Sequence, residues 1–176
     1  FLMAVGLVWG ASNLSYAQFE QGQQIESASG YSVLSPRQRV TPENAMVNHR
    51  LKTLLPKLME ETNIDLWLVI NREYAEDPVY FTLVPQPTFA ARRTTMLIFQ
   101  RVLDEAGQPQ VRALSVNRYP LGAPYEVIWA GGNLMEQWRA LGQLVQDLDP
   151  KRIGINVSAH WPVADGLTQG LYEQLV

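Results

Sequence analysis

Two short runs of the sequence are apolar without a break, and they limit the folds open to this chain. Residues 66–70 read LWLVI and residues 94–99 read TTMLIF. A strand with one face in water alternates apolar and polar residues, whereas a continuously apolar strand is typical of a sheet covered on both faces. We therefore predict a sheet that has these two strands in its interior and helices on both sides.

Three more strands are expected. Residues 111–116 form an apolar run after the turn at 104–109, and residues 125–130 form a weaker run that ends at two glycines. Apolar residues alternate along residues 153–157, which predicts a fifth strand.

The first helix is predicted to begin at Thr41-Pro42-Glu43. Thr41 would cap it, Pro42 would occupy the first helical position, and Glu43 would place an acid in the first turn. Pro56 falls inside the helical pattern and removes a backbone hydrogen bond, so a kink or a junction of two short helices is expected there. The face expected to be buried comprises Val47, Leu51, Leu54, Leu55, Leu58 and Met59.

Two later helices complete the pattern. Asn133 and Glu136 form a capping-box pattern ahead of an amphipathic helix over residues 134–148, and Asp165 is placed to cap the last helix. The order is helix, four strands, helix, strand, helix. It predicts a single α/β domain with a mixed, mostly buried sheet and flanking helices.

The N-terminal segment has features of an export signal, although the positive n-region is missing. Residues 1–11 are apolar and uncharged, which suits a signal-peptide core and is shorter than the roughly 20 residues of a membrane-spanning helix. A buried N-terminal strand or helix is the alternative. A leucine stripe still runs at Val176, so the domain is expected to be truncated there. The expected parts are a signal peptide (1–17), a flexible tether (18–34) and the domain (35–176).

Composition and motifs exclude several kinds of chemistry. The chain has no cysteine, and its net charge of −3 gives no electrostatic footprint for nucleic acid. Dinucleotide-binding, phosphate-loop and zinc-protease motifs are absent from the sequence. His49 and His160 lie far apart and are not expected to share a metal ion. We predict no catalytic residue, no metal ligand and no bound cofactor in this chain.

The segment 71–78 (NREYAEDP) is the candidate site. It follows the strand at 66–70 directly, and ligands in α/β folds gather at the C-terminal ends of strands. It holds Arg, Tyr and three acids, which suits either a polar loop with local salt bridges or the lining of a pocket or subunit interface.

Five runs together resemble one family. The runs SPRQRV (35–40), IDLWLVINREYAEDPVYFTLVP (64–85), PTFAARRTTMLIF (87–99), DPKRIGINVS (149–158) and ADGLT (164–168) occur in order. They resemble the N-terminal domain of the creatinase, prolidase and Xaa-Pro aminopeptidase family, most closely an exported bacterial Xaa-Pro-peptidase-like branch. The resemblance covers residues 35–176.

The resemblance implies a ribonuclease-H-like fold without nuclease function, followed by a catalytic domain outside this chain. That domain would bind two divalent metal ions (Mn, Co or Zn) through two Asp, one His and two Glu, and the metals would activate water for attack on a peptide substrate. The N-terminal domain would pack on it, support a homodimer and narrow the entrance to the pocket. Candidate residues for these roles are Arg72, Tyr74, Asp77, Arg92 and Arg93.

The expected function is thus that of a non-catalytic N-terminal domain of an exported, periplasmic or secreted metallopeptidase, with no membrane association after signal cleavage. Its parent would be an aminopeptidase or dipeptidase. A stand-alone α/β binding module is the alternative. A nuclease is disfavoured, because the strands end or begin with Asn71, Arg93 and Asn117 rather than with metal-binding carboxylates.

The leader generates the first testable prediction. Small residues at Ser15 and Ala17 place signal-peptidase cleavage before Gln18. N-terminal sequencing of protein exported from a bacterial host is expected to begin at Gln18. Soluble cytoplasmic protein that retains residues 1–17 would contradict the leader.

Overall fold

A computed structural model describes residues 33–176 of the chain. The predicted signal peptide (1–17) and its cleavage site, and all but the last two residues of the predicted tether (18–34), lie outside the described residues. Residues 40–176 form one compact unit, and the whole sheet belongs to it.

The core of this unit is a five-stranded mixed sheet. Its strands are β1 (Leu66–Arg72), β2 (Thr94–Leu103), β3 (Pro109–Asn117), β4 (Glu126–Trp129) and β5 (Ile153–Ile155). Their order in the sheet is β4-β3-β2-β1-β5. β2 runs antiparallel to both of its neighbours, whereas β3 and β4, and β1 and β5, pair in parallel. The prediction of a mixed sheet in an α/β fold is confirmed.

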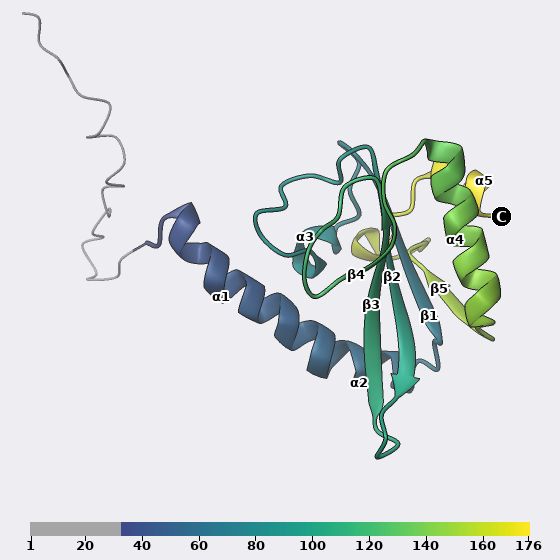
Figure 1. Cartoon of the computed structure of the whole chain (residues 1–176), viewed down its shortest axis with the longest axis horizontal. Helices are drawn as coiled ribbons and strands as arrows, with labels where there is room; N and C mark the ends of the chain where they lie inside the picture. The colour runs from purple at the N-terminus through teal and green to yellow at the C-terminus, as the bar shows by residue number, and fades with distance from the viewer. Residues whose placement is uncertain (1–32) are drawn as a thin grey trace, which may run out of the picture. The chain divides into compact units, whose positions relative to one another are not determined.

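The reversed direction of β2 decides what meets at each end of the sheet. β1, β3, β4 and β5 all run one way, so their C-terminal ends share one end of the sheet with the start of β2. The long loops after β1 and β3 also lie at that end, opposite the β2–β3 hairpin (Figure 1). Segments distant in sequence are therefore brought together there.

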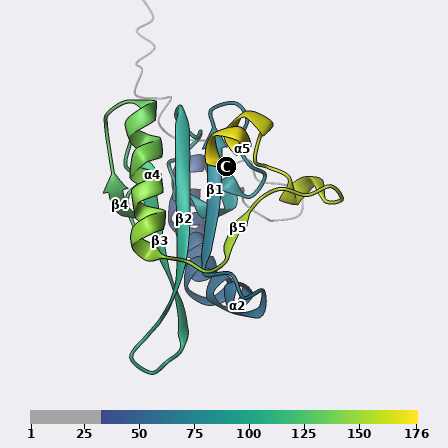
Figure 2. The ribbon, with the colours of Figure 1, turned by 90° about the vertical axis from the view of Figure 1, so that its right-hand side faces the viewer.

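Helices cover both faces of the sheet, as predicted. α4 (Leu134–Leu148) and α5 (Gln169–Leu175) lie on one face (Figures 1 and 2). Residues 47–61, which end in α2 (Leu55–Glu61), lie on the opposite face of the sheet together with the short helix α3 (Tyr80–Leu83). Neither α3 nor the 3-10 turn Pro162–Ala164 was predicted, because each is a single turn with no periodic pattern.

Alternate residues of the central strands enter two separate cores. Leu66, Leu68 and Ile70 of β1 pack in the core beneath α4 and α5, and Val69 packs in the opposite core. Trp67 is only half-buried, and it packs on Phe99 with ring centroids 5.3 Å apart. Among the strand residues, the largest fully buried side chain is therefore Phe99 of β2, and Trp67 is partly exposed.

The first helix departs from its predicted start. α1 spans Pro36–His49, so Thr41 does not cap it and Pro42 lies inside it. Residues Arg50–Leu54 then form a π-helical segment that leads into α2, with Pro56 in the first turn of α2. The junction expected near Pro56 thus exists as a wide turn. It lets a helix continue where the missing N–H of proline would break the hydrogen-bond ladder.

The π turn also explains which leucines are buried. Val47, Leu51, Leu55 and Met59 face the core, whereas Leu54 and Leu58 are about half exposed, contrary to the predicted six-residue face. In an α-helix of 3.6 residues per turn, a four-residue spacing drifts around the axis. The wider π turn reverses that drift, so this narrow stripe stays on the sheet.

The predicted cap of α4 is confirmed, whereas the predicted cap of α5 is wrong. Asn133 and Glu136 form the predicted capping box of α4, and Asp149 ends it in a left-handed conformation. α5 begins after Thr168 rather than at the predicted cap Asp165. The Asp165 carboxylate instead accepts the Ser158 backbone N–H at 3.0 Å within the preceding loop.

Asp65 ties together the other end of the sheet. Its carboxylate lies 2.5 Å from the Arg101 guanidinium of β2 and accepts the backbone N–H groups of Lys151 and Arg152, each at 3.0 Å, beside β5. The hydrogen bond from Arg101, reinforced by these backbone donors against partial desolvation, lowers the pKa of Asp65. The ionised form is therefore favoured by folding, and this stabilisation is lost as the pH falls through the lowered pKa.

Two phenylalanines provide a matched test of this core. Phe99 of β2 is fully buried, whereas Phe89 is 75% exposed. Phe99→Ala is expected to lower the free energy of unfolding by about 3–5 kcal/mol, because it leaves a cavity. Phe89→Ala is expected to change it by less than about 0.5 kcal/mol. Urea melts measure both; similar losses in the two variants would contradict the described packing.

Candidate functional site

A row of buried polar side chains closes the end of the sheet where the long loops meet. Asn71, Thr95 and Asn117 are paired in register across β1, β2 and β3, and each is at most 3% exposed. Asn71 Nδ2 donates to the Thr95 carbonyl at 3.3 Å, and Asn117 Oδ1 accepts the Met96 backbone N–H at 2.7 Å. These side chains fix the strand ends from which the loops depart.

Asp77 extends this row into a network. Its backbone N–H donates to Asn71 Oδ1 at 3.0 Å, and its Oδ1 accepts the Val79 N–H at 2.9 Å. Its Oδ2 accepts Asn156 Nδ2 at 2.7 Å, and Asn156 Oδ1 accepts the Trp67 indole N–H at the same distance. Asp77 is 1% exposed. Its carboxylate therefore joins the loop after β1 to the loop after β5.

Gly166 shows how tightly the Asp77 carboxylate is enclosed. A Cβ at this position would lie 2.7 Å from the Asp77 Cβ and 2.1 Å from its Oδ2, far inside normal contact. Only glycine fits there without movement of the loop. The predicted site residue Asp77 is thus a buried structural anchor, and it is not among the residues that line the cleft described next.

Beside this anchor lies a cleft of about 510 Å³. The structure brings three predicted site residues together in it: Arg72, Tyr74 and Arg93. Arg118, which follows β3, and Trp129 of β4 complete its polar and aromatic lining, and the first turn of α4 closes one side. Sequence reasoning missed Arg118 and Trp129. The position of Arg118 directly after a buried strand, like that of Arg72, is the signal that could have found it.

The backbone that presents these side chains is held in an unusual conformation. Tyr74, Arg92 and Arg93 have φ values of 68°, 41° and 73°, in the left-handed region that costs a non-glycine residue roughly 1–2 kcal/mol. The two loops support each other: the Glu73 N–H donates to the Arg93 carbonyl at 2.8 Å, and the Arg93 N–H donates to Glu73 Oε2 at 3.1 Å. The strain is thus concentrated where the candidate residues lie, a pattern common at binding sites.

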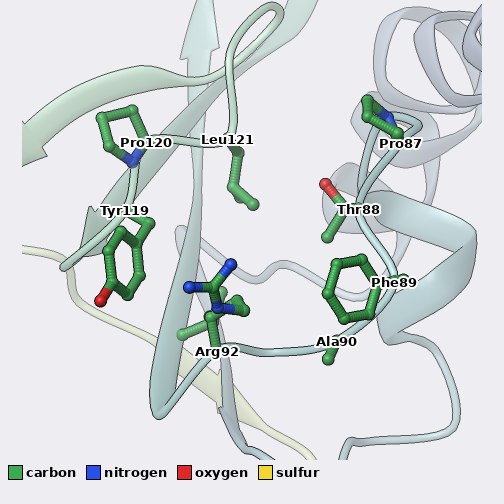
Figure 3. A pocket seen from close by; sticks show the side chains of 9 residues that line it. Pro87, Thr88, Phe89, Ala90, Arg92, Tyr119, Pro120 and Leu121 are labelled. Carbon is green, nitrogen blue, oxygen red and sulfur yellow. The ribbon is translucent and has the colours of Figure 1, made fainter.

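Arg92 does not line this cleft but a second pocket, of about 230 Å³. Its guanidinium stacks on the Tyr119 ring, 4.5 Å from the centroid. Figure 3 shows Arg92 between Tyr119 and Phe89 in this view. Four of the five predicted residues therefore line one of two adjacent pockets, and the fifth, Asp77, supports them.

Gln137 fastens α4 to the cleft. It is 3% exposed, and its Nε2 donates to the carbonyls of Thr94 at 2.9 Å and Val116 at 2.7 Å. One amide thus bridges β2 and β3 where both reach the cleft. The polar position in the apolar stripe of the predicted helix was the available signal for this residue.

Charge is distributed unevenly over the sheet. Arg101 and Arg112 pair with Asp65 and Glu126, at 2.5 Å and 2.8 Å. The three cleft arginines make no ion pair and no side-chain hydrogen bond with any residue in 33–176. Glu73 is the one acid that lines the cleft. The cleft therefore carries a net positive charge.

Residues 33–176 were searched for metal-binding groups and for membrane-spanning helices. Within that range, no group of three or more His, Cys, Asp or Glu side chains is arranged to hold a metal ion. None of the helices described there is long and apolar enough to cross a membrane.

Comparisons with family models, curated proteins and solved structures gave no match for this chain. The family resemblance therefore stays a prediction from the sequence.

The contrast between anchor and cleft is testable by mutation. Asp77→Ala removes an acceptor from buried donors and is expected to lower the free energy of unfolding by about 2–3 kcal/mol. Arg72→Ala changes an exposed side chain and is expected to alter it by less than about 1 kcal/mol. Urea melts of the two variants decide this. An Arg72→Ala protein as unstable as Asp77→Ala would show that Arg72 is a structural residue.

Proposed function

We propose that this chain is the non-catalytic N-terminal domain of an exported Xaa-Pro aminopeptidase or prolidase-like metallopeptidase, and that its fold is the creatinase N-terminal type. In this proposal the domain packs on a catalytic domain that binds two divalent metal ions, Mn, Co or Zn. It supports a homodimer and restricts which peptides reach the metals, in the periplasm or outside the cell.

The positions of the resembling runs in the structure support this proposal. The run 64–85 supplies β1 and the Asp77 loop, and the run 149–158 supplies β5 and Asn156. The run 164–168 contains Gly166, which packs on Asp77. The run 64–85 therefore meets two runs from the C-terminal part of the chain in one buried network. Residues that form such a network depend on one another for folding, so a family that shares the fold would be expected to retain them together.

The observation that carries the proposal is the composition of the cleft. A guanidinium stays protonated at all physiological pH values, so it does not serve as a base or nucleophile. It binds and orients anionic or carbonyl oxygens instead. A cleft lined by Arg72, Arg93 and Arg118 with Tyr74 and Trp129 is thus suited to recognition. That is the role expected of a domain that restricts access to a neighbouring active site.

The same cleft also favours a second candidate, a stand-alone binding module. All of its lining residues come from one compact unit, residues 40–176. Recognition by this cleft therefore requires no partner domain. The two candidates differ in whether a metal-binding domain follows in the same reading frame.

A full-length protein tests the first candidate. Continuation past Val176 is expected to encode a domain with two Asp, one His and two Glu as metal ligands, and the full-length protein is expected to hydrolyse Xaa-Pro peptides with Mn²⁺, Co²⁺ or Zn²⁺. The 176-residue chain alone is expected to be inactive with the same metals. Hydrolysis by this chain that a chelator abolishes would overturn the domain assignment, and a reading frame without such a domain would favour the binding module.

Two variants of the full-length protein test the role of the cleft. Arg72→Gln is expected to raise KM or weaken the dimer while leaving metal content unchanged. Arg152→Gln is the control, because Arg152 is exposed, lies at the opposite end of the sheet and contacts Asp65 only through its backbone. Equal behaviour of the two variants would argue against a role for the cleft.

A further inference from the structure

We infer that the cleft between the ends of β1 and β3 and the start of α4 is a binding site for a small ligand that carries a carboxylate or phosphate group. The inference rests on the recognition role proposed above and names the ligand class. The groups assigned to the oxyanion are the guanidinium groups of Arg72, Arg93 and Arg118.

The charge of the cleft favours an anion. The chain has a net charge of −3, yet three arginines without an acid partner in residues 33–176 line one cleft against a single acid, Glu73, and the Arg118 guanidinium also lies 5.9 Å from the Tyr119 ring centroid. One Glu73 oxygen, Oε2, accepts the Arg93 backbone N–H. Arginines elsewhere on the sheet pair with acids at 2.5 Å and 2.8 Å. Like charges gathered without counter-charges repel one another, and a bound anion relieves that repulsion.

The shape and placement of the guanidinium groups also suit an oxyanion. A guanidinium presents its donors in a planar fork that matches both oxygens of a carboxylate or two of a phosphate. The three arginines come from three different chain segments, at the end of β1, the start of β2 and the end of β3. They therefore line the cleft from separate positions. The start of α4 adds the positive end of a helix dipole, but its capping Glu136 offsets this, so the arginines carry the site.

The backbone around the cleft is held in place before a ligand binds. The Glu73 N–H donates to the Arg93 carbonyl, the Arg93 N–H donates to the Glu73 carboxylate, and Gln137 holds α4 to the strands beside Thr94. Tyr74 and Arg93 keep left-handed backbones there. A site whose backbone is fixed before binding loses less entropy when a ligand is ordered. The supports below the cleft thus favour binding of a specific ligand.

The size of the cleft indicates a small molecule. Its volume of about 510 Å³ falls within the range of ordinary ligand pockets. Tyr74, which is 94% exposed, and Trp129 offer aromatic surface for the organic part of the ligand. A lone inorganic ion would use only the arginines.

Calorimetric titration of the 176-residue chain tests the inference. Inorganic phosphate and succinate are the two probes, each at low ionic strength and matched against sodium chloride, because salt screens such contacts. Saturable binding of one probe or both is expected, and the stronger one identifies the preferred oxyanion. Arg93→Gln and Arg118→Gln are each expected to weaken it at least tenfold, and Arg152→Gln less than twofold. Thermal melts establish that the variants are folded.

Three results would overturn the inference: no saturable binding of either probe, unchanged affinity in both cleft variants, or an equal loss in Arg152→Gln, which would indicate general screening. Arg118→Gln keeps the test decisive if Arg93→Gln fails to fold, because Arg118 has no left-handed backbone. Oxyanion binding by a chain whose reading frame lacks a metal-binding domain would remove the peptidase proposal and leave this inference standing. Metal-dependent peptidase activity of the full-length protein without oxyanion binding would support the peptidase proposal and overturn this inference.

Discussion

The buried carboxylate of Asp77 is the interaction on which this end of the molecule depends. No cation pairs with it among residues 33–176, so hydrogen bonds alone compensate for its removal from water. Those bonds come from the Val79 backbone and from Asn156, while Asn71 accepts the Asp77 backbone N–H. Satisfying one carboxylate thus fixes the loop after β1, the loop after β5 and the close approach of Gly166.

The reversed direction of β2 places the start of that strand at the same end of the sheet as Asp77. Because β2 alone is reversed, its first residues lie beside the last residues of β1 and β3. Arg72, Arg93 and Arg118 flank those three strand ends, so a sheet that buries its apolar residues also gathers three cations. The left-handed backbones of Tyr74 and Arg93 are tolerated there because the surrounding hydrogen bonds over-determine them.

Features set by short-range chemistry could be predicted from the sequence. The apolar runs at 66–70 and 94–99 became interior strands, and the Asn133 capping box formed as expected. The predicted starts of the first and last helices were wrong, because Ser35 and Gln38 exchange capping hydrogen bonds ahead of Thr41 and the Asp165 carboxylate accepts the Ser158 N–H instead.

The candidate site was likewise predicted in part. The position of Arg72 and Tyr74 after a buried strand was local information. The burial of Asp77 and the contributions of Arg118 and Gln137 depend on contacts between segments far apart in sequence, which a polar residue alone does not reveal.

Three arginines at the end of the sheet form one oxyanion site in this structure. Side-chain NMR of the arginine Nε–Hε groups tests this most directly, during titration of the chain with phosphate at constant ionic strength. If they form a single site, the resonances of Arg72, Arg93 and Arg118 shift along one saturation curve with one Kd, while that of Arg152 does not saturate. Cleft resonances that shift with unrelated affinities, or only as Arg152 does, would contradict it.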